Sequence, residues 1–324
     1  MSNLVVIKAP IKKEMEEFET FFKSSMKSKV PLLDHITNYI LRRKGKQLRP
    51  IMVFLAARII GEPNQSTYTA AALIELLHTA TLIHDDIVDD SYERRGFFSL
   101  YAIWKTKIAV LVGDYLLSRG LLLAVEKKEY QILEIVSEAV KEMSEGELFQ
   151  IQKARKLDIT EKEYFDIIRK KTATLMIACA ASGASSVNQD DLKINKLKKY
   201  AEHAGIAFQI KDDIFDYQKK GIIGKPIAND IKEKKITLPL IYALSNSSNH
   251  EKRNILNLIR HNSNNTGKIQ KVVNFVISKK GVEYAIAKME EHKLSAIESL
   301  AEFPDNEAKL SLIKLADYFT ERNK

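Results

Sequence analysis

Two groups of aspartates with the same spacing are the residues of this chain best suited to chemistry. They are Asp85, Asp86, Asp89, Asp212, Asp213 and Asp216, and each group follows the pattern D-D-x-x-D. Residues four apart share a helix face, so a helix through either group would stack two like charges that repel each other. Carboxylate oxygens are the ligands that Mg²⁺ takes in proteins, together with phosphate oxygens of a substrate. The spacing therefore predicts magnesium sites for a phosphorylated substrate.

Plainer interpretations of these groups exist. A single acidic cluster at a helix end is often only a solvated face, and a calcium loop is a second alternative. The clusters lack the glycine and terminal glutamate of an EF-hand loop. Each follows apolar residues, at 80–83 and at 207–210, and stacked carboxylates beside a buried face need compensating cations. The repetition of one pattern favours metal binding over a solvated surface.

Basic residues accompany both aspartate clusters. Arg94 and Arg95 follow the first cluster, and Lys225 and Lys235 follow the second. Further candidates are Lys46 and Arg49 in the segment GKQLRP (45–50), and Lys171 followed by Thr172. Taken singly, each is more simply a surface charge. Together with two magnesium sites they predict capture of more than one diphosphate.

The elements that would position these residues are helical throughout. Apolar residues recur at spacings of three and four, as in Leu73, Leu76, Leu77 and Ala80, which is typical of amphipathic helices. We expect helices at about 13–27, 31–43, 46–60, 67–90, 106–126, 129–152, 161–181, 190–217, 235–245, 251–260, 267–278, 281–301 and 306–322. Ser66 or Thr67 is expected to cap the fourth of these helices. No alternating strand pattern persists, so the sequence predicts an all-α fold.

Length and composition narrow the class of protein. The chain has 324 residues with 12 Gly, 7 Pro and one cysteine, Cys179, which excludes an internal disulfide and any multi-cysteine metal site. The net charge of +9 comes from dispersed lysines without a base-reading motif, so we expect no nucleic-acid partner. No run of about 20 uninterrupted apolar residues and no signal peptide is evident, and we expect a cytoplasmic protein. No linker divides the chain.

At these motifs the chain resembles the trans-type polyprenyl diphosphate synthases, and most closely the long-chain octaprenyl and heptaprenyl enzymes. The matching segments are HTATLIHDDIVDDSYERRG (78–96), FQIKDDIFDY (208–217), GKQLRP (45–50), KTATL (171–175) and GDYLL (113–117). The resemblance spans about 40–240. It implies one domain over 1–324, an all-α bundle around a central cavity with a catalytic core at about 40–240. Peripheral helices at about 245–324 carry no site-like cluster of their own, and a homodimer is the expected assembly.

The resemblance also implies a role for each matching residue. Asp85, Asp89 and Asp212 would ligate Mg²⁺, three ions per active site, with Asp86, Asp213 and Asp216 assisting. The allylic diphosphate would bind to Arg94, Lys171, Gln209, Lys225 and Lys235. Isopentenyl diphosphate would bind to Lys46, Arg49, His78 and Arg95. Thr172 would hydrogen-bond near the reacting carbon. Two departures, Lys234 and the pair Ala228-Asn229, stand where the family often has glycine.

The implied reaction condenses isopentenyl diphosphate with an allylic diphosphate such as farnesyl diphosphate. Small residues before Asp85, namely Ala80 and Thr81 beside Leu77, suggest an open tunnel and an all-trans product of C30–C40, with Met143 as a candidate floor. Close helix packing is the other explanation for their size. A short-chain farnesyl or geranylgeranyl diphosphate synthase, a terpene cyclase and a non-catalytic partner subunit or scaffold remain alternatives. Because the product is hydrophobic, peripheral membrane contact is expected for its release, although no anchor helix is visible.

Overall fold

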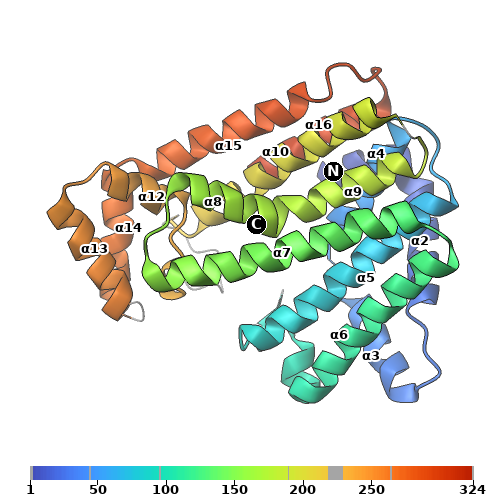
Figure 1. Ribbon diagram of the computed structural model, residues 1–324, viewed down its shortest axis with the longest axis horizontal. Coiled ribbons are helices and arrows are strands. Elements are labelled where there is room, and N and C mark those ends of the chain that lie inside the picture. Colours follow the sequence, from blue (N-terminus) through green and yellow to red (C-terminus); the bar gives the residue numbers. More distant parts are fainter. Residues whose placement is uncertain are drawn as a thin grey trace. The chain divides into compact units, whose positions relative to one another are not determined.

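The computed structural model describes residues 3–43, 45–94, 96–188, 190–217, 229–262 and 265–322 (Figure 1). Its helices confirm the predicted all-α class, and its only strands within this part of the chain are a two-residue antiparallel pair. The chain divides into two compact units. Unit 1 comprises Met1–Ser137, Ala178–Leu197 and Phe303–Leu312, and unit 2 comprises Glu138–Ile177, Lys198–Glu302 and Ile313–Lys324.

Unit 1 contains the first aspartate cluster. Its elements are α1 (Asn3–Lys8), the 3₁₀ helix η1 (Ala9–Ile11), α2 (Lys12–Ser25), α3 (Pro31–Arg42), α4 (Leu48–Arg58), α5 (Gln65–Val88), β1 (Glu93–Arg94), β2 (Phe97–Phe98), α6 (Leu100–Glu126), the first residues of α7 (Tyr130–Lys156), most of α9 (Thr174–Ser185) and the first residues of α10 (Asp191–Phe215) and α16 (Glu307–Glu321). The predicted start of α5 was off by a few residues, because Asn64 is the cap. Asn64 Oδ1 accepts from the backbone N–H groups of Ser66 and Thr67.

Helices α5 and α6 lie side by side in unit 1 (Figure 1). Two glycines of α6 permit the approach. A Cβ atom on Gly120 would lie 3.1 Å from Leu73 Cδ1, and one on Gly113 would overlap the His84 ring. Helix α6 begins at Leu100, six residues before the predicted start. Lys105, with φ 66°, interrupts the helical backbone there, which explains why the periodic pattern is clear only after it.

Helix α6 is also long and apolar enough, by length and composition alone, to cross a membrane, and no other helix of the described residues meets that criterion. A core helix of a soluble protein passes the same test. Its residues Ala109, Val112, Leu116 and Ala124 are buried, as expected for a helix that packs against α5.

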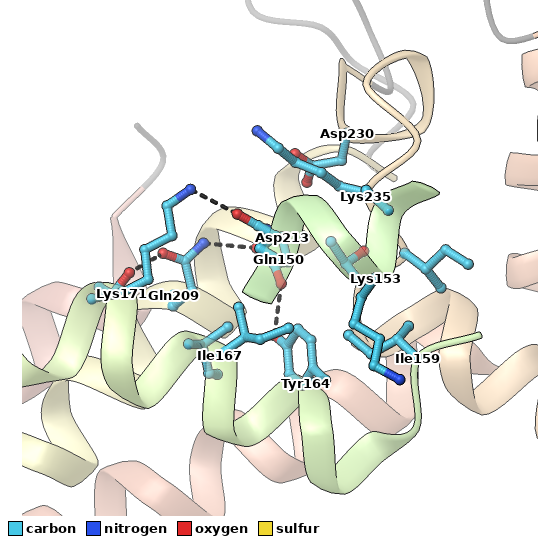
Figure 2. A pocket seen from close by; sticks show the side chains of 15 residues that line it. Gln150, Lys153, Ile159, Tyr164, Ile167, Lys171, Gln209, Asp213, Asp230 and Lys235 are labelled. Atoms are coloured by element: carbon cyan, nitrogen blue, oxygen red, sulfur yellow. Dashed lines mark hydrogen bonds between the residues drawn. The ribbon is translucent and has the colours of Figure 1, made fainter. Parts of the chain in front are cut away.

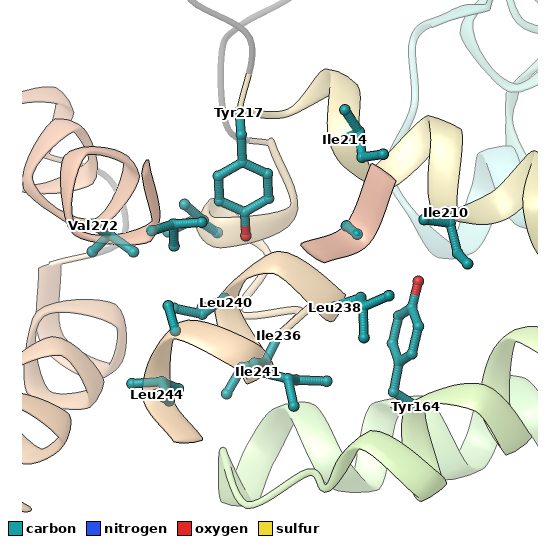
Figure 3. Packing of buried hydrophobic residues seen from close by; sticks show 14 of the residues in the cluster. Tyr164, Ile210, Ile214, Tyr217, Ile236, Leu238, Leu240, Ile241, Leu244 and Val272 are labelled. Carbon is teal, nitrogen blue, oxygen red and sulfur yellow. The ribbon is translucent and has the colours of Figure 1, made fainter. Parts of the chain in front are cut away.

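Unit 2 contains the second aspartate cluster. Its elements are the rest of α7, α8 (Glu161–Ile168), the π-helix η2 (Arg169–Ala173), most of α10 (Asp191–Phe215), α11 (Asn229–Lys232), α12 (Leu238–Ser245), α13 (Asn249–Asn262), α14 (Thr266–Ser278), α15 (Gly281–Glu298) and the end of α16 (Glu307–Glu321). One apolar core joins α8, α10, α12, α14 and α15, and Figure 3 shows Leu238, Leu240 and Ile241 of α12 in it.

The helix predicted at 161–181 is not continuous. Residues 169–173 form a π-helical turn between α8 and α9. Such turns insert an extra residue and occur often at functional sites. This one contains Lys171 and Thr172, so the backbone irregularity falls on the residues that the sequence selects for diphosphate binding.

Candidate active site

A pocket in unit 2 gathers most of the residues predicted to bind the allylic diphosphate. It is lined by Gln150, Lys153, Ala154, Ile159, Tyr164, Ile167, Ile168, Lys171, Thr172, Gln209, Asp213, Asp230, Lys235, Ile236 and Thr237. Its volume is about 100 Å³. That is well below the roughly 300–1,000 Å³ of a typical small-molecule pocket. It can hold a small anionic group but not a long hydrocarbon tail.

Asp213 is the centre of a hydrogen-bond chain in this pocket (Figure 2). The Tyr164 hydroxyl donates to Asp213 Oδ2 at 2.6 Å, and the Gln209 amide donates to Asp213 Oδ1 at 2.8 Å. Thr172 in turn donates to Gln209 Oε1 at 2.7 Å. The chain fixes the orientation of Gln209 and Asp213, and it links the π-helical turn to the end of α10.

The pKa of Asp213 is raised to about 7, mainly by burial; its two hydrogen bonds lower this pKa, and the charges of Asp212 and Asp216 raise it. Burial likewise raises the pKa of Asp230 to about 8, with repulsion from Asp213 and Asp216 adding to the shift. Three carboxylates therefore crowd one partly desolvated region. The binding of cations beside these carboxylates would therefore be strongly favoured.

The two outer aspartates of the second cluster remain accessible. Asp212 and Asp216 are half-buried, whereas Asp213 is 4% exposed. Asp216 Oδ2 accepts from the backbone N–H of Asp230 at 2.6 Å. Asp212 Oδ1 lies 2.8 Å from Arg322 Nη2. This contact was not predicted, because the sequence alone gave no role to the residues after 245.

The first cluster shows the same arrangement in unit 1. Asp85 and Asp89 are exposed, and Asp86 is 5% exposed. Both clusters also lie at helix C-termini, since α5 ends at Val88 and α10 ends at Phe215. The negative end of the helix dipole disfavours carboxylates there, and neither helix has a basic residue in its last turn. This placement costs stability unless cations bind.

The lysines of the pocket each contact an acidic residue. Lys171 donates to Gln150 Oε1 at 2.7 Å and pairs with Glu147. Lys235 pairs with Glu233. Lys153 lies 2.8 Å from Glu163 Oε1, so its ammonium is held at one side of the pocket. A diphosphate would compete with these exposed carboxylates for Lys171 and Lys235 at little cost, since exposed ion pairs contribute little.

Lys46, Arg49 and His78, three of the residues predicted to bind isopentenyl diphosphate, lie in unit 1. Lys46 is exposed and Arg49 is half-buried at the start of α4, while His78 is 9% exposed on α5. Pro50 stands in the first turn of α4. The backbone of Arg94 belongs to β1 and pairs with Phe97. Arg95 and Lys225 lie outside the described residues.

The chain-length candidates divide by helix face. Ala80 is fully buried, and its spacing from Leu76 and His84 places it on the face of α5 that meets the α6 glycines. Close packing therefore accounts for its size. Thr81 is half-buried on the face of Asp85 and donates to His78 O at 2.9 Å. Leu77 is buried in α5 and Met143 is half-buried in α7.

Sequence reasoning missed several residues of the site. Gln150, Lys153, Tyr164 and Asp230 line the pocket without having been selected. Asp230 could have been selected from the sequence, because it is the last residue of the segment GKPIAND (224–230). The departure from the family pattern at position 234 falls on an unusual backbone conformation. Lys234 has φ 59°, which is in the left-handed region that favours glycine. The departure from the family pattern therefore carries some backbone strain and leaves the pocket residues in place.

The donor set of each cluster fits a hard divalent cation. In the described part of the chain, no group of three or more His, Cys, Asp or Glu side chains is arranged to hold a metal by itself. Each cluster instead presents two accessible carboxylates beside a buried one. Mg²⁺ usually takes only one or two carboxylates and completes its shell with water and substrate phosphate oxygens.

Comparisons with known proteins identify the family of this chain. The family model for polyprenyl synthetase matches residues 30–276. The chain is 34% identical over 320 residues to the all-trans-nonaprenyl-diphosphate synthase (geranyl-diphosphate specific) of Rhodobacter capsulatus, covering 98% of this chain and 97% of that one. A polyprenyl synthase from Caulobacter crescentus, solved with calcium and isoprenyl diphosphate, has a TM-score of 0.90 at 31% identity, covering 99% and 98%. A geranylgeranyl pyrophosphate synthase from Bacteroides thetaiotaomicron has a TM-score of 0.85 at 37% identity, covering 99% and 100%.

An all-α fold, two aspartate clusters at helix ends and a small pocket lined by three lysines fit the prenyl-transferring class of protein that the comparisons identify. The chain belongs to the polyprenyl synthetase family and has the isoprenoid synthase fold. It is a trans-prenyltransferase that makes a polyprenyl diphosphate, and it stands near the long-chain members.

Proposed function

We propose that this chain condenses isopentenyl diphosphate with an allylic diphosphate such as farnesyl diphosphate, and that it elongates the product to C30–C40. The pocket of unit 2 carries the proposal, because it brings Lys171, Thr172, Gln209 and Lys235 together beside Asp213. Lys171, Gln209 and Lys235 are among the residues predicted for the allylic diphosphate, and Thr172 is the residue predicted to lie near the reacting carbon. The similarity to a nonaprenyl synthase favours a long product, and the similarity to a geranylgeranyl synthase keeps a short one as the alternative.

The reaction begins with cleavage of the allylic C–O bond, and the electron pair leaves with the diphosphate. Lys171 and Lys235 stabilise the charge that develops on the departing oxygens. The double bond of isopentenyl diphosphate then attacks the allylic carbon, and a proton passes to the released diphosphate. Thr172 supplies a polar contact near the reacting carbon, and Gln209, held by Thr172 and Asp213, contacts the allylic diphosphate.

We propose Mg²⁺ as the cofactor, three ions per site, with Asp85, Asp89 and Asp212 as ligands and Asp86, Asp213 and Asp216 in support. When bound, the metal supplies charge stabilisation to the diphosphate leaving group. The accessible outer aspartates and the calcium in the Caulobacter crescentus enzyme support a divalent ion. Lys46, Arg49, His78 and Arg95 are proposed to hold isopentenyl diphosphate, and Arg94 is proposed to hold the allylic diphosphate.

We also propose a cytoplasmic homodimer with one catalytic domain over 1–324. The support is a stripe of exposed apolar residues on one face of α6: Val110, Leu111, Leu121, Leu122 and Val125, each between 37% and 58% exposed. A second copy of the chain would cover this stripe. As an alternative, the stripe would contact a membrane surface, into which the hydrophobic product is released.

The experiment that tests the function incubates the purified protein with farnesyl and isopentenyl diphosphates and Mg²⁺, then identifies the dephosphorylated products. We expect isopentenyl-dependent chains of C30–C40. A C20 end point would support the short-chain alternative. Turnover of farnesyl diphosphate alone would identify a terpene cyclase, and no turnover would identify a partner subunit or scaffold.

Variants locate the activity in the proposed site. Asp85→Asn and Asp212→Asn should each lower kcat by at least about 100-fold, since a ligand to the catalytic metal is lost. Asp191→Asn is the matched control, because Asp191 is an exposed aspartate in the first turn of the same helix as Asp212. Equal losses in all three variants would contradict the assignment.

A further inference from the structure

Arg322, which directly follows α16, holds one carboxylate of the second aspartate cluster. Its Nη2 atom lies 2.8 Å from Asp212 Oδ1 and also donates to the backbone carbonyl of Phe208 at 3.0 Å. Its Nε atom donates to the carbonyl of Phe319 at 3.2 Å. The guanidinium therefore joins the end of the chain to the last turns of α10.

Aromatic side chains fix this guanidinium in place. Its Cζ atom lies 3.7 Å from the centroid of the Phe208 ring and 5.8 Å from that of Phe215. Phe319 is fully buried and packs edge-on against Phe208 at 5.3 Å. The Arg322 side chain is only 10% exposed, whereas that of Asp212 is 41% exposed. A buried, stacked arginine thus presents a defined donor to a carboxylate that solvent and ligands can reach.

We propose that Arg322 is a positioning residue for the metal-binding carboxylate of Asp212. The inference rests on the proposed function, in which Asp212 ligates a divalent ion. Arg322 occupies Oδ1 and leaves Oδ2 for the metal. Hydrogen-bond partners of this kind orient ligating groups, and their loss commonly weakens metal binding by about 10- to 100-fold.

A competing effect acts in the opposite direction. Arg322 is a cation, so its removal also removes a repulsion that a bound metal would feel. Because Asp212 is 41% exposed, water screens this repulsion. The orientation, in contrast, depends on contacts that water does not screen: two backbone hydrogen bonds and an aromatic stack. We therefore expect the loss of orientation to dominate, and the sign of the change in affinity tests this.

The test is a titration of the full-length protein with Mn²⁺ in the presence of inorganic diphosphate, with free Mn²⁺ measured by electron paramagnetic resonance. Arg322→Met keeps the length and apolar packing of the side chain but removes its charge and donors. We expect its Mn²⁺ affinity to be at least about 10-fold lower than that of the wild type. Arg322→Lys, which keeps the charge but loses the planar fork, should fall between the two.

Leu315→Ala is the matched control for lost stability. Leu315 is fully buried in α16, seven residues before Arg322, so its truncation leaves a cavity and keeps the guanidinium. Its thermal midpoint should fall while its Mn²⁺ affinity stays that of the wild type. Unchanged or tighter binding in Arg322→Met, or an equal loss in Leu315→Ala, would overturn the positioning role. A wild-type protein that binds no Mn²⁺ would instead overturn the proposed use of a metal.

Discussion

The imidazole of His84 occupies the space that a side chain at Gly113 would need. A Cβ atom on Gly113 would lie 2.1 Å from His84 Nε2, and the same nitrogen lies 3.6 Å from Asp114 Oδ1. His84 directly precedes Asp85 in α5. The glycine of the GDYLL segment therefore keeps room for a side chain at the base of the first aspartate cluster.

Gly113→Ala should displace the His84 ring and disturb Asp85 beside it. The obstructing atoms are the far end of a side chain that can rotate, so we expect a stability loss of only about 1 kcal/mol. The main effect should be a severalfold higher Mg²⁺ concentration for half-maximal activity. Thermal unfolding and a Mg²⁺ titration of activity measure the two effects separately.

Gly183→Ala provides the contrast for this prediction. A Cβ atom there would lie 2.2 Å from the backbone oxygen of Val53, which cannot rotate away. We expect a stability loss of about 3 kcal/mol or more, the upper range for overpacking. If Gly113→Ala were equally destabilising, the space at Gly113 would serve helix packing rather than His84.

Tyr164→Phe should lower the free energy of unfolding more than a similar change elsewhere in unit 2. It removes the 2.6 Å hydrogen bond to Asp213, and bonds to charged groups contribute about 1.5–3 kcal/mol. The comparison is Tyr217→Phe, which removes a 3.1 Å bond between the buried hydroxyls of Tyr217 and Thr237 and should cost about 1 kcal/mol. Denaturant unfolding at pH 8.5, where Asp213 is mostly ionised, measures both. A larger loss in Tyr217→Phe would show that the Asp213 bond is unimportant.

The sequence was sufficient to predict the helices because their apolar periodicity is long and uninterrupted. It was sufficient for the pocket residues Lys171, Thr172, Gln209 and Lys235 because they lie in recognisable motifs. The predicted roles of these residues stay predictions. The π-helical turn at 169–173 was missed, since one inserted residue leaves the helical pattern almost unchanged.

Two other features could not be predicted for a different reason. Arg322 is more than 100 residues from Asp212 in sequence, and neither its type nor its spacing indicates a partner. The capping of α5 by Asn64 depends on which of several polar residues adopts an extended backbone. Both outcomes are decided by tertiary packing rather than by local pattern.

A pair of histidines in unit 2 should make stability depend on pH. His203 Nδ1 lies 2.9 Å from His292 Nδ1. Burial, together with the neighbouring His203 charge and Lys288, lowers the pKa of His292 to about 4 despite Glu291. Burial also lowers the pKa of His203. The charges of Glu202 and Glu291 raise this pKa, and that of Lys199 lowers it.

Both folded-state pKa values lie below the ordinary 6.5, so the unfolded chain binds more protons between about pH 4 and 6.5. The contribution of the histidine pair to the free energy of unfolding is therefore largest above pH 6.5 and falls as the pH drops through this window. Replacing both residues, as His203→Gln with His292→Gln, should reduce the drop in thermal midpoint between pH 7 and 5 by a few degrees. Changing the exposed His261 to Gln is the control and should leave the drop unchanged. An unaltered pH dependence in the double variant would exclude the pair as its source.

The two small residues before Asp85 should respond differently to enlargement. Ala80 is fully buried on the α6-facing side of α5, so Ala80→Phe should overpack the interface and lower stability by about 1–3 kcal/mol or more. Thr81 is half-buried on the face that carries Asp85, so Thr81→Phe should be tolerated and should place its ring beside the growing chain. We expect it to shorten the main product by at least one C5 unit.

Product analysis by chromatography, beside thermal unfolding of both variants, separates these outcomes. Thr81→Ser is the control, because it keeps the hydroxyl that donates to His78 O and changes the volume only slightly. It should give the wild-type product. If Thr81→Phe retains the full product length while Ala80→Phe folds normally and shortens it, the growing chain passes on the α6 side of α5. That result would show that the small residue at 80 serves product length rather than helix packing.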